Sequence, residues 1–440
     1  MNIRKPVFWL LDYLRGSKIG RHYRDIATTL ESDATILQSK SLEYRDNAFR
    51  YAMSKVPFYR QLANIERFED LPLIDKSIVK QQFDQFRSAD YLDVKLHKMS
   101  TSGSTGTPFT ILQDKAKRQR VLAEILYFNH LVGIDLGHRL VYYRVLTKNT
   151  RKSWLLRKIQ NESLVDTSNL DKDHLMKLEL DVRNYPRHSC LFGYASSIET
   201  LGHFIYHEVP PSVWEFYPIE AVITGAEALS PTGRKILQSI FKCPVVSRYS
   251  NQEMGILAQQ SGQNEAFALN WASYYFEIFD LNKDEPLPLG QPGRIVITDL
   301  FNLAMPLLRY DTGDIGTLNE MEVQGKSQIV LKTLEGRRVD YIIDANGNIV
   351  SPHMITLQMW DFQEIRQFQF VQEGNLNYLL RLNVQQKPFE REQEMKNRYL
   401  QLLGASSSIR FEYVNEIPTL SSGKRKPVVN EWTSKSKDDL

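Results

Sequence analysis

The chain has 440 residues, 42% of them hydrophobic and 24% charged, which is ordinary for a globular protein with more than one domain. Its 55 basic and 52 acidic residues leave a formal net charge of +3, which is too balanced to indicate nucleic acid or an anionic membrane as a partner. Two cysteines far apart, Cys190 and Cys243, are typical of a reducing cytoplasm and exclude a disulfide framework or a C-x-x-C zinc site.

The N-terminal part of the chain, up to about residue 62, has the pattern of a mostly helical segment. Residues 25–53 are polar, nearly free of glycine and apolar at helical spacing, which predicts one long helix that stops before Pro57. No stretch of the chain is apolar for long enough to cross a bilayer. Residues 6–14 are apolar and aromatic but interrupted by charge, and for them we favour packing against the main body over a peripheral membrane contact.

A run of hydroxyl residues and glycines follows, between two apolar segments. Residues 100–107 hold six hydroxyl side chains and two glycines, and glycine lets such a loop curl so that its N–H groups point inward. Residues 94–99 and 109–113 are predicted as flanking strands, so the pattern favours a strand–loop–strand site for a polyphosphate over a flexible linker. It is not a Walker motif, because no lysine follows the second glycine. The predicted phosphate-binding residues are Ser100, Thr101, Ser102, Gly103, Ser104, Thr105, Gly106 and Thr107.

The middle of the chain alternates helices with short apolar strands. The pattern predicts helices over residues 115–131, 171–184 and 230–241, the last with Ser230 as its N-cap and Pro231 at its first position. It also predicts a basic, exposed segment over residues 147–157. The expected strands cover residues 139–146, 190–193, 219–224 and 244–247. This alternation predicts an α/β sheet that is parallel at least in part.

From residue 267 the pattern changes to β segments joined by turns, over residues 268–279, 294–299 and 316–318. They predict a β-rich subdomain in which Trp271, Tyr274 and Tyr275 pack as core. A small α+β unit is predicted after it, with strands over 368–371, 376–384 and 409–414 and a helix over 388–403. The predicted fold is therefore α/β, with a large N-terminal domain over residues 1–335 and a small C-terminal domain over residues 336–440.

Six motifs, in this order, resemble those of the adenylate-forming enzymes, the superfamily of acyl-CoA synthetases and nonribosomal-peptide adenylation domains. The hydroxyl-rich loop is the first, and the others lie at residues 225–227, 249–253, 309–314, 336–341 and 418–424. Ahead of them stand V-P-F-Y-R at residues 56–60 and L-P-L-I-D-K at residues 71–76. These two, with the compact length, look most like the phenylacetate–CoA ligase branch, which includes the CapK-type proteins tied to capsular polysaccharide synthesis.

This resemblance implies an ATP- and Mg²⁺-dependent, AMP-forming ligase with a small mobile C-terminal lid. A carboxylate oxygen attacks the α-phosphorus of ATP, pyrophosphate leaves, and an acceptor then displaces AMP from the acyl-adenylate. The acceptor is a thiol, of CoA or of a carrier protein, or an amine such as that of an amino sugar, in polysaccharide or secondary-metabolite biosynthesis. A small carboxylic acid is the expected substrate, the expected location is cytoplasmic, and neither a nucleic-acid partner nor an integral membrane segment is expected.

The resemblance also gives roles to single residues. Tyr249 would pack against adenine, Glu253 would bind Mg²⁺, and Asp314 would accept hydrogen bonds from both ribose hydroxyls. Arg337 would contact the ribose–phosphate region, and Lys424 would offset charge at the α-phosphate when the lid closes. Each residue taken alone also has a structural interpretation, such as a core tyrosine, an exposed turn aspartate or one cation of a basic segment. The remaining ATP-binding candidates are Gly225, Ala226, Glu227 and Arg309.

The chain departs from the family pattern at three positions. Ser250 replaces the usual glycine, Gln252 replaces the usual threonine beside the α-phosphate, and Val339 replaces an Asp or Lys at the hinge. The last two changes bear on adenylation and on the second half-reaction, respectively. They leave open an alternative function, a nucleotide-binding but catalytically incomplete member that acts within a biosynthetic assembly. Retention of Glu253 and Lys424 argues for the complete ligase.

Overall fold

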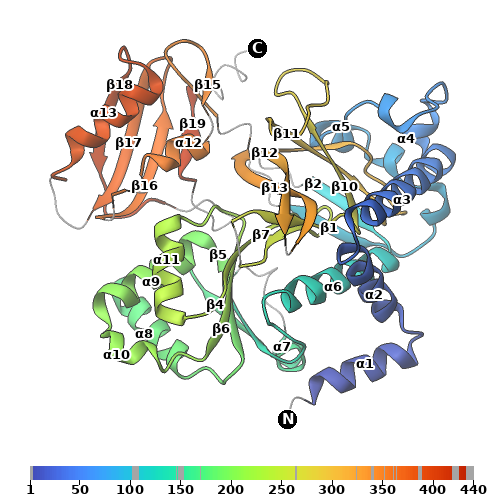
Figure 1. The fold of residues 1–440 in the computed structure, drawn as a ribbon, viewed down its shortest axis with the longest axis horizontal. Coiled ribbons are helices and arrows are strands. Elements are labelled where there is room, and N and C mark those ends of the chain that lie inside the picture. The colour runs from blue at the N-terminus through green and yellow to red at the C-terminus, as the bar shows by residue number, and fades with distance from the viewer. Residues whose placement is uncertain are drawn as a thin grey trace. The chain divides into compact units, whose positions relative to one another are not determined.

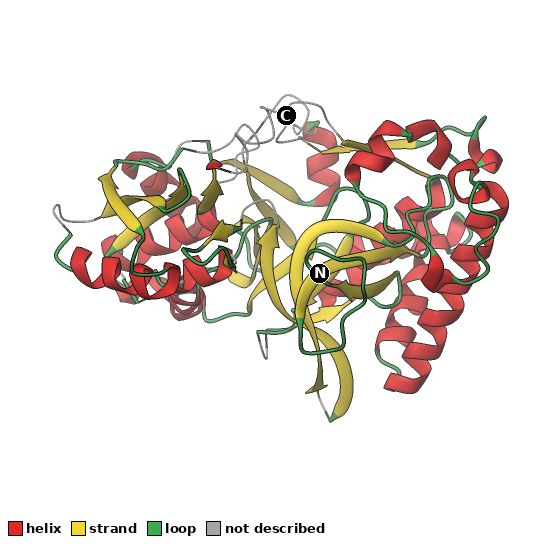
Figure 2. Cartoon of the chain, turned by 90° about the horizontal axis from the view of Figure 1, so that it is seen from above, coloured by secondary structure: helices red, strands yellow, loops and turns green. Residues whose placement is uncertain are grey.

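The computed structural model divides into two compact units. Unit 1 comprises residues 1–138 and 246–334, and unit 2 comprises residues 139–245 and 335–440. The predicted domain boundary between residues 335 and 336 stays a prediction. The structure describes residues 3–101, 109–144, 146, 153–168, 170–262, 265–323, 325–337, 341–350, 352–359, 361–362, 364–384, 389–418 and 426–432. Figure 2 shows that the chain contains both helices and strands, and the α/β class is confirmed.

Unit 1 begins with helices, as predicted, but the prediction of a single helix over residues 25–53 is wrong. The chain forms α2 (Lys18–Leu30) and α3 (Ala34–Lys55), because Asp33 adopts extended backbone and breaks the helical run. Helix α3 ends at Lys55, and Val56 is extended, since the residue preceding a proline is biased away from helical backbone. The other helices here, labelled where there is room in Figure 1, are α1 (Arg4–Leu14), α4 (Pro57–Arg60), α5 (Lys76–Gln81) and α6 (Lys115–His130), with 3₁₀ turns η1 (Phe68–Asp70), η2 (Phe83–Phe86) and η3 (Ala89–Tyr91).

The strands of unit 1 form a hairpin and a larger sheet. The hairpin pairs β1 (His97–Thr101) with β2 (Phe109–Gln113). In the sheet the strand order is β10-β11-β12-β13-β9-β8-β7, and the neighbouring pairs β10/β11, β11/β12, β13/β9, β9/β8 and β8/β7 are antiparallel. The strands are β7 (Val245–Ser250), β8 (Ile256–Gln260), β9 (Phe267–Leu269), β10 (Tyr274–Phe279), β11 (Pro292–Asp299), β12 (Tyr310–Val323) and β13 (Lys326–Arg337). This is the predicted β-rich part.

The core of unit 1 joins these strands to the N-terminal helices. Trp271 and Tyr274 are buried in it, and Tyr275 packs against it, so the predicted packing role of these aromatic residues is confirmed. The same cluster contains Ile111 of β2, Met254 of the β7–β8 connection and Tyr310 of β12. The hairpin, the connection and β12 are therefore held against one another by apolar contacts, which gives the segments carrying the site a fixed relative geometry.

The first part of unit 2 is a parallel sheet with the order β6-β5-β3-β4, which confirms the prediction of parallel pairing. Its strands are β3 (Arg139–Arg144), β4 (Glu162–Asp166), β5 (Ser189–Tyr194) and β6 (Ile219–Gly225). Its helices are α7 (Trp154–Gln160), α8 (Lys172–Arg183), α9 (Ala195–Glu208), α10 (Pro211–Trp214) and α11 (Pro231–Phe241). Side chains of α8, α9 and α11 pack on the strands in one core, as the grouping of these helices beside the strands in Figure 1 illustrates.

Two helices of this part show what local signals reveal. Helix α11 begins as predicted, with Pro231 at its first position and the Ser230 side chain accepting a hydrogen bond from the Gly233 amide at 2.9 Å. Helix α7 was expected to be a basic exposed segment, yet the Ser153 hydroxyl accepts from the Leu156 amide and starts a helix. The basic composition identified its exposure but not its backbone.

Glu199 of α9 is expected to make the stability of unit 2 depend on pH. Its carboxylate accepts a hydrogen bond from the Ser230 amide at 2.6 Å, but burial raises its pKa to about 7. Because the folded state then holds the proton more tightly than the unfolded chain, this residue's contribution to stability falls as pH rises from about 4.5 to about 7. We expect Glu199→Gln to lose this fall, worth about 3 kcal/mol, in melting curves recorded from pH 4.5 to 8. The exposed Glu215→Gln should leave the wild-type slope, and an unchanged slope in Glu199→Gln would contradict the assignment.

The second part of unit 2 is the predicted small α+β fold. It contains a four-stranded sheet of order β18-β17-β16-β19, and the helices of this part pack against the sheet in one core. Strands β14 and β15 form a short antiparallel pair. The elements are β14 (Ile342–Ile343), β15 (Ile349–Val350), α12 (Pro352–Leu357), β16 (Ile365–Gln372), β17 (Asn377–Val384), α13 (Glu392–Leu403), β18 (Ser408–Tyr413) and β19 (Val428–Asn430). Among the described helices of the chain, none combines the length and apolar character that spanning a membrane requires.

Candidate active site

The predicted phosphate loop is framed by the β1–β2 hairpin. Ser100 pairs with Thr110 and Thr101 with Phe109, and the Ser100 and Thr110 hydroxyls lie 3.0 Å apart. The strand–loop–strand arrangement is confirmed at its two ends, although β1 begins at His97 rather than at residue 94. The loop residues Ser102, Gly103, Ser104, Thr105, Gly106 and Thr107 lie outside the described residues.

Tyr249 of β7 and Asp314 of β12 are brought together. The Tyr249 hydroxyl donates to Asp314 Oδ2 at 2.7 Å, and the Asp314 amide donates to Thr312 Oγ1 at 3.1 Å. Burial raises the pKa of Tyr249 well above its ordinary value, and the neighbouring Asp314 carboxylate adds to the rise. The phenol therefore stays protonated and acts as a donor that orients the carboxylate. Sequence motifs 65 positions apart thus meet in one pair.

Glu253 lies on the tight connection between β7 and β8. The Asn251 side chain accepts from the Met254 amide at 2.9 Å, and the Gln113 side chain donates to the Glu253 carbonyl at 2.9 Å. Gln113 is the last residue of β2, so the hairpin that frames the predicted phosphate loop also fixes the Glu253 backbone. The Glu253 side chain is only 3% exposed. A buried carboxylate needs a cation or strong donors beside it.

Lys76 supplies that cation, and the sequence analysis missed it as a site residue. Its Nζ lies 2.9 Å from Glu253 Oε1, although the angle is poor for a hydrogen bond and leaves Oε1 without an aligned donor. Its side chain is 41% exposed and passes over the Phe109 ring at 5.6 Å. Lys76 closes the L-P-L-I-D-K segment and begins α5, where the Asp75 side chain caps the helix. Its place in that motif, shortly before the hydroxyl-rich loop, was the signal available.

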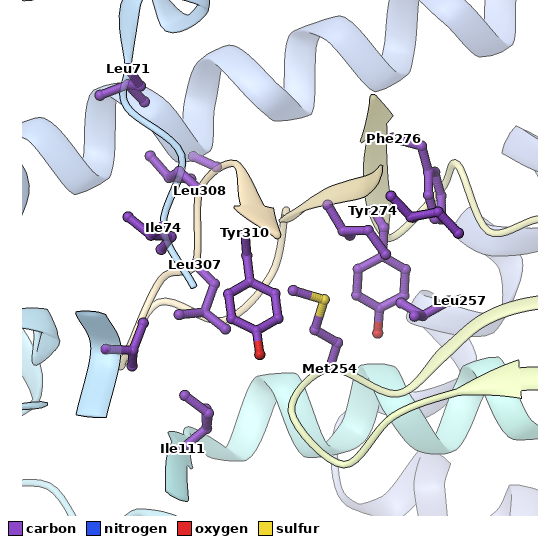
Figure 3. Packing of buried hydrophobic residues seen from close by; sticks show 14 of the residues in the cluster. Leu71, Ile74, Ile111, Met254, Leu257, Tyr274, Phe276, Leu307, Leu308 and Tyr310 are labelled. Carbon is purple, nitrogen blue, oxygen red and sulfur yellow. The ribbon is translucent and has the colours of Figure 1, made fainter. Parts of the chain in front are cut away.

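Tyr310 is a second buried group near these residues. Its ring lies parallel to that of Phe109 at 6.4 Å, and its hydroxyl accepts or donates no hydrogen bond among the described residues. Burial raises its pKa well above the ordinary value, and Glu253 and Asp314 add to the rise. Figure 3 shows the Met254 side chain between the rings of Tyr310 and Tyr274. An unpaired buried hydroxyl costs free energy, so a ligand that accepts a hydrogen bond from it would be favoured here.

A buried network on α6 holds the connection that carries Glu253. Glu124 accepts from the Ile256 amide at 3.2 Å and from the Tyr274 hydroxyl at 3.2 Å. Burial raises the pKa of Glu124, and the nearby Lys117 opposes that rise. Gly255 has φ +144°, and a Cβ there would stand 2.6 Å from the Glu124 carboxylate, so only glycine fits. The buried Glu124 carboxylate therefore fixes the backbone geometry of the connection between β7 and β8.

Arg309 is placed away from any exposed surface. Its guanidinium donates to the carbonyls of Glu69 and Leu71, each at 2.6 Å, and pairs with Glu277 at 3.2 Å. These contacts tie β12 to the segment before α5. The expected contact of Arg309 with ATP stays a prediction, and the observed contacts of its guanidinium position the neighbouring strand.

Gly225, Ala226 and Glu227 lie in unit 2, where β6 ends. Ala226 has φ +66°, and Glu227 Oε2 accepts from the Ser196 amide at 2.9 Å in the first turn of α9. A carboxylate is favourable at a helix N-terminus, which supports the structural interpretation of this turn. Its role beside adenine stays a prediction. Arg337 is the last residue of β13, and Lys424 lies outside the described residues.

Comparison with known proteins identifies relatives of this chain. The family model of the CapK C-terminal domain matches residues 342–431. Protein CapK of Staphylococcus aureus is 24% identical over 435 residues, which cover 93% of this chain and 92% of CapK. A phenylacetate-coenzyme A ligase of Thermus thermophilus is 32% identical over 127 residues, 28% of each chain.

The fold is shared with a solved ligase. The crystal structure of 2-hydroxyisobutyryl-CoA ligase in the postadenylation state, in complex with 2-HIB-AMP, matches with a TM-score of 0.74 and 18% identity. The match covers 94% of this chain and 93% of that one. The order of motifs, the two relatives in sequence and this shared fold agree with one another. The chain is therefore similar to Protein CapK along most of its length, matches the CapK C-terminal domain over residues 342–431 and shares its fold with this CoA ligase.

Proposed function

We propose that this protein activates a carboxylic acid with ATP as an acyl-adenylate and passes the acyl group to an acceptor. The observation that supports this best is the arrangement within unit 1. The Tyr249–Asp314 pair, the buried Glu253 carboxylate and the two strands that frame the hydroxyl-rich loop are fixed together by Gln113 and by one apolar core. These are the groups that would bind the ribose, the metal and the phosphates of one nucleotide.

In the proposed reaction the chain positions groups and balances charge. The carboxylate oxygen of the acid attacks the α-phosphorus, and the bond to the departing pyrophosphate breaks. Asp314, oriented by Tyr249, accepts hydrogen bonds from the ribose hydroxyls, and Ser100, Thr101 and the loop after them hold the β- and γ-phosphates. Lys424 offsets charge around the α-phosphate, and Arg337 contacts the ribose–phosphate region.

Glu253 is the residue that would hold Mg²⁺. Its buried oxygen without an aligned donor fits the role, since magnesium in nucleotide sites takes one or two carboxylates together with substrate phosphates. When bound, the metal neutralises phosphate charge. Lys76 holds the carboxylate in place before the nucleotide arrives.

The acceptor is proposed to be a thiol, with CoA first because two relatives are named as CoA ligases. A carrier-protein thiol and the amine of an amino sugar remain further acceptors, the latter in line with the CapK likeness and a role in capsular polysaccharide synthesis. A cytoplasmic location is proposed with this function, because ATP and CoA are supplied there.

The test is ATP–pyrophosphate exchange with a panel of carboxylic acids, followed by mass spectrometry of products formed with CoA or amino sugars. Acid-dependent exchange is the expected result. ATP binding without exchange for any acid would instead favour the catalytically incomplete member suggested by Gln252 and Val339.

Tyr249→Phe is expected to raise the KM for ATP about three- to tenfold with little change in kcat. The ring that would pack on adenine is kept, while the donor that orients Asp314 is lost. Steady-state exchange kinetics measure both constants. Tyr217→Phe, which removes a buried phenol that donates to Glu179 in unit 2, is the matched control and should leave the KM unchanged. Equal effects of the two variants on the KM would contradict the proposal that Tyr249 orients Asp314.

A further inference from the structure

Helix α1 is fixed to the body of unit 1 through one face. The Trp9 ring meets Tyr23 of α2 edge to face at 5.9 Å, and Lys5 pairs with Asp135. The Asp12 carboxylate accepts from the Ile19 and Gly20 amides, at 3.1 and 2.8 Å, in the first turn of α2. The predicted packing of this segment against the main body is therefore present, but these contacts use only half of the helix.

The opposite face of α1 is apolar and open. Positions 3, 7, 10 and 14 recur at helical spacing along one line, and Leu11 and Tyr13 border it. The exposed fractions are large: Ile3 68%, Val7 46%, Leu10 58%, Leu11 44%, Tyr13 71% and Leu14 69%. Single exposed apolar residues are common, but a continuous exposed stripe marks a contact surface.

The charge around this stripe is of one sign. Residues 3–24 contain a single carboxylate, Asp12, which is 6% exposed and faces α2. The same stretch has six exposed basic residues, Arg4, Lys5, Arg15, Lys18, Arg21 and Arg24. The remainder of the chain is nearly balanced, so this positive charge is concentrated at the helix and the turn after it.

An apolar helix with basic residues around it could contact a second copy of this chain or a membrane. The small size of α1 distinguishes between these two surfaces. A second copy of this chain would meet α1 with a like-charged helix of three turns, far short of the roughly 800 Å² per partner of a stable interface. A membrane imposes no such minimum. Helix α1 has 11 residues and is about 16 Å long, roughly half of the hydrocarbon thickness, so it can lie in the interface but not span it.

We propose that α1 seats this protein on the surface of an anionic lipid bilayer. The Ile3–Leu14 stripe enters the acyl boundary, Tyr13 lies at the headgroup level, and the basic residues other than Lys5 contact anionic headgroups. The Asp12 and Trp9 contacts hold the helix in the orientation that faces the stripe outward. This seating is independent of the proposed ligase chemistry.

The test is flotation of the full-length protein with phosphatidylcholine vesicles that contain 30% phosphatidylglycerol or none. We expect binding to the anionic vesicles that falls at least tenfold without phosphatidylglycerol and weakens with salt. Leu10→Glu/Leu14→Glu should lower binding at least tenfold. Met176→Glu/Leu180→Glu is the matched control, since these residues are also four apart on an exposed helix face, 47% and 49% exposed, and it should bind like wild type.

Thermal melts and gel filtration accompany the vesicle assay. The two double variants should melt like wild type, because all four leucine and methionine side chains are exposed. Equal binding by the Leu10→Glu/Leu14→Glu variant and wild type would overturn the proposal. So would a wild-type dimer that this variant converts to a monomer, together with absence of binding to either vesicle.

Discussion

Lys424→Ala is expected to lower the rate of ATP–pyrophosphate exchange by about two to three orders of magnitude while leaving the melting temperature unchanged. The reason is that the α-phosphate gains negative charge as the carboxylate attacks, and a cation supplied only at that stage stabilises the transition state more than the bound substrates. The P-T-x-x-S-G-K match at residues 418–424 carries this role.

Neighbouring cations separate a specific role for Lys424 from general charge. Arg425→Ala removes the same formal charge one position later, and we expect it to change the exchange rate less than threefold. Lys424→Arg should retain part of the activity, because charge is kept while the ammonium point charge is replaced by a planar group. Wild-type exchange by Lys424→Ala would show that another residue performs this task.

Local signals predicted much of the fold. The Ser230–Pro231 pair predicted the start of α11 because a cap and a fixed φ act within one turn. The apolar strands of unit 2 predicted parallel pairing because buried parallel strands are apolar on both faces. The break between α2 and α3 was missed, since helical spacing continues across residues 31–33 while Asp33 adopts extended backbone.

Candidate site residues could be proposed from the sequence where they lie in a recognisable motif. Their contact partners could not be predicted where those partners lie far away in the sequence. The chain motifs pointed to Tyr249, Glu253 and Asp314, and the structure adds that Tyr249 donates to Asp314. In the sequence, the β1–β2 hairpin and the first part of unit 2 lie between Lys76 and Glu253. No rule based on residue spacing predicts an ion pair between residues so far apart. The contacts of the Arg309 guanidinium with the carbonyls of Glu69 and Leu71 likewise join distant segments, and they were not predictable from its motif.

Glu253→Gln is expected to lower the exchange rate at least a hundredfold and to remove the stabilisation that Mg²⁺ gives in the presence of ATP. Glutamine keeps the size of the side chain and removes the charge that magnesium requires. The readouts are exchange rates and melting temperatures over a series of Mg²⁺ concentrations. Glu277→Gln is the control, because it changes another buried carboxylate of unit 1 that pairs with Arg309. It should keep the wild-type dependence on Mg²⁺.

Lys76→Met distinguishes a metal ligand from a structural carboxylate. Without the ammonium, the buried Glu253 charge loses the cation that pairs with it among the described residues. This should lower the free energy of unfolding by about 1–2 kcal/mol, a reduced figure because Lys76 is 41% exposed. Glu253→Gln should cost less, since the freed lysine can turn into water. The double variant should therefore be more stable than Lys76→Met alone.

Magnesium should then act differently on the two single variants. In Lys76→Met the metal with ATP can supply the missing positive charge, so it should raise the melting temperature more than it does in wild type. In Glu253→Gln it should raise it less than in wild type, because the ligand is gone. If Mg²⁺ with ATP stabilised all three proteins equally, Glu253 would be a structural partner of Lys76, and the metal would have to be held by the phosphates and other residues.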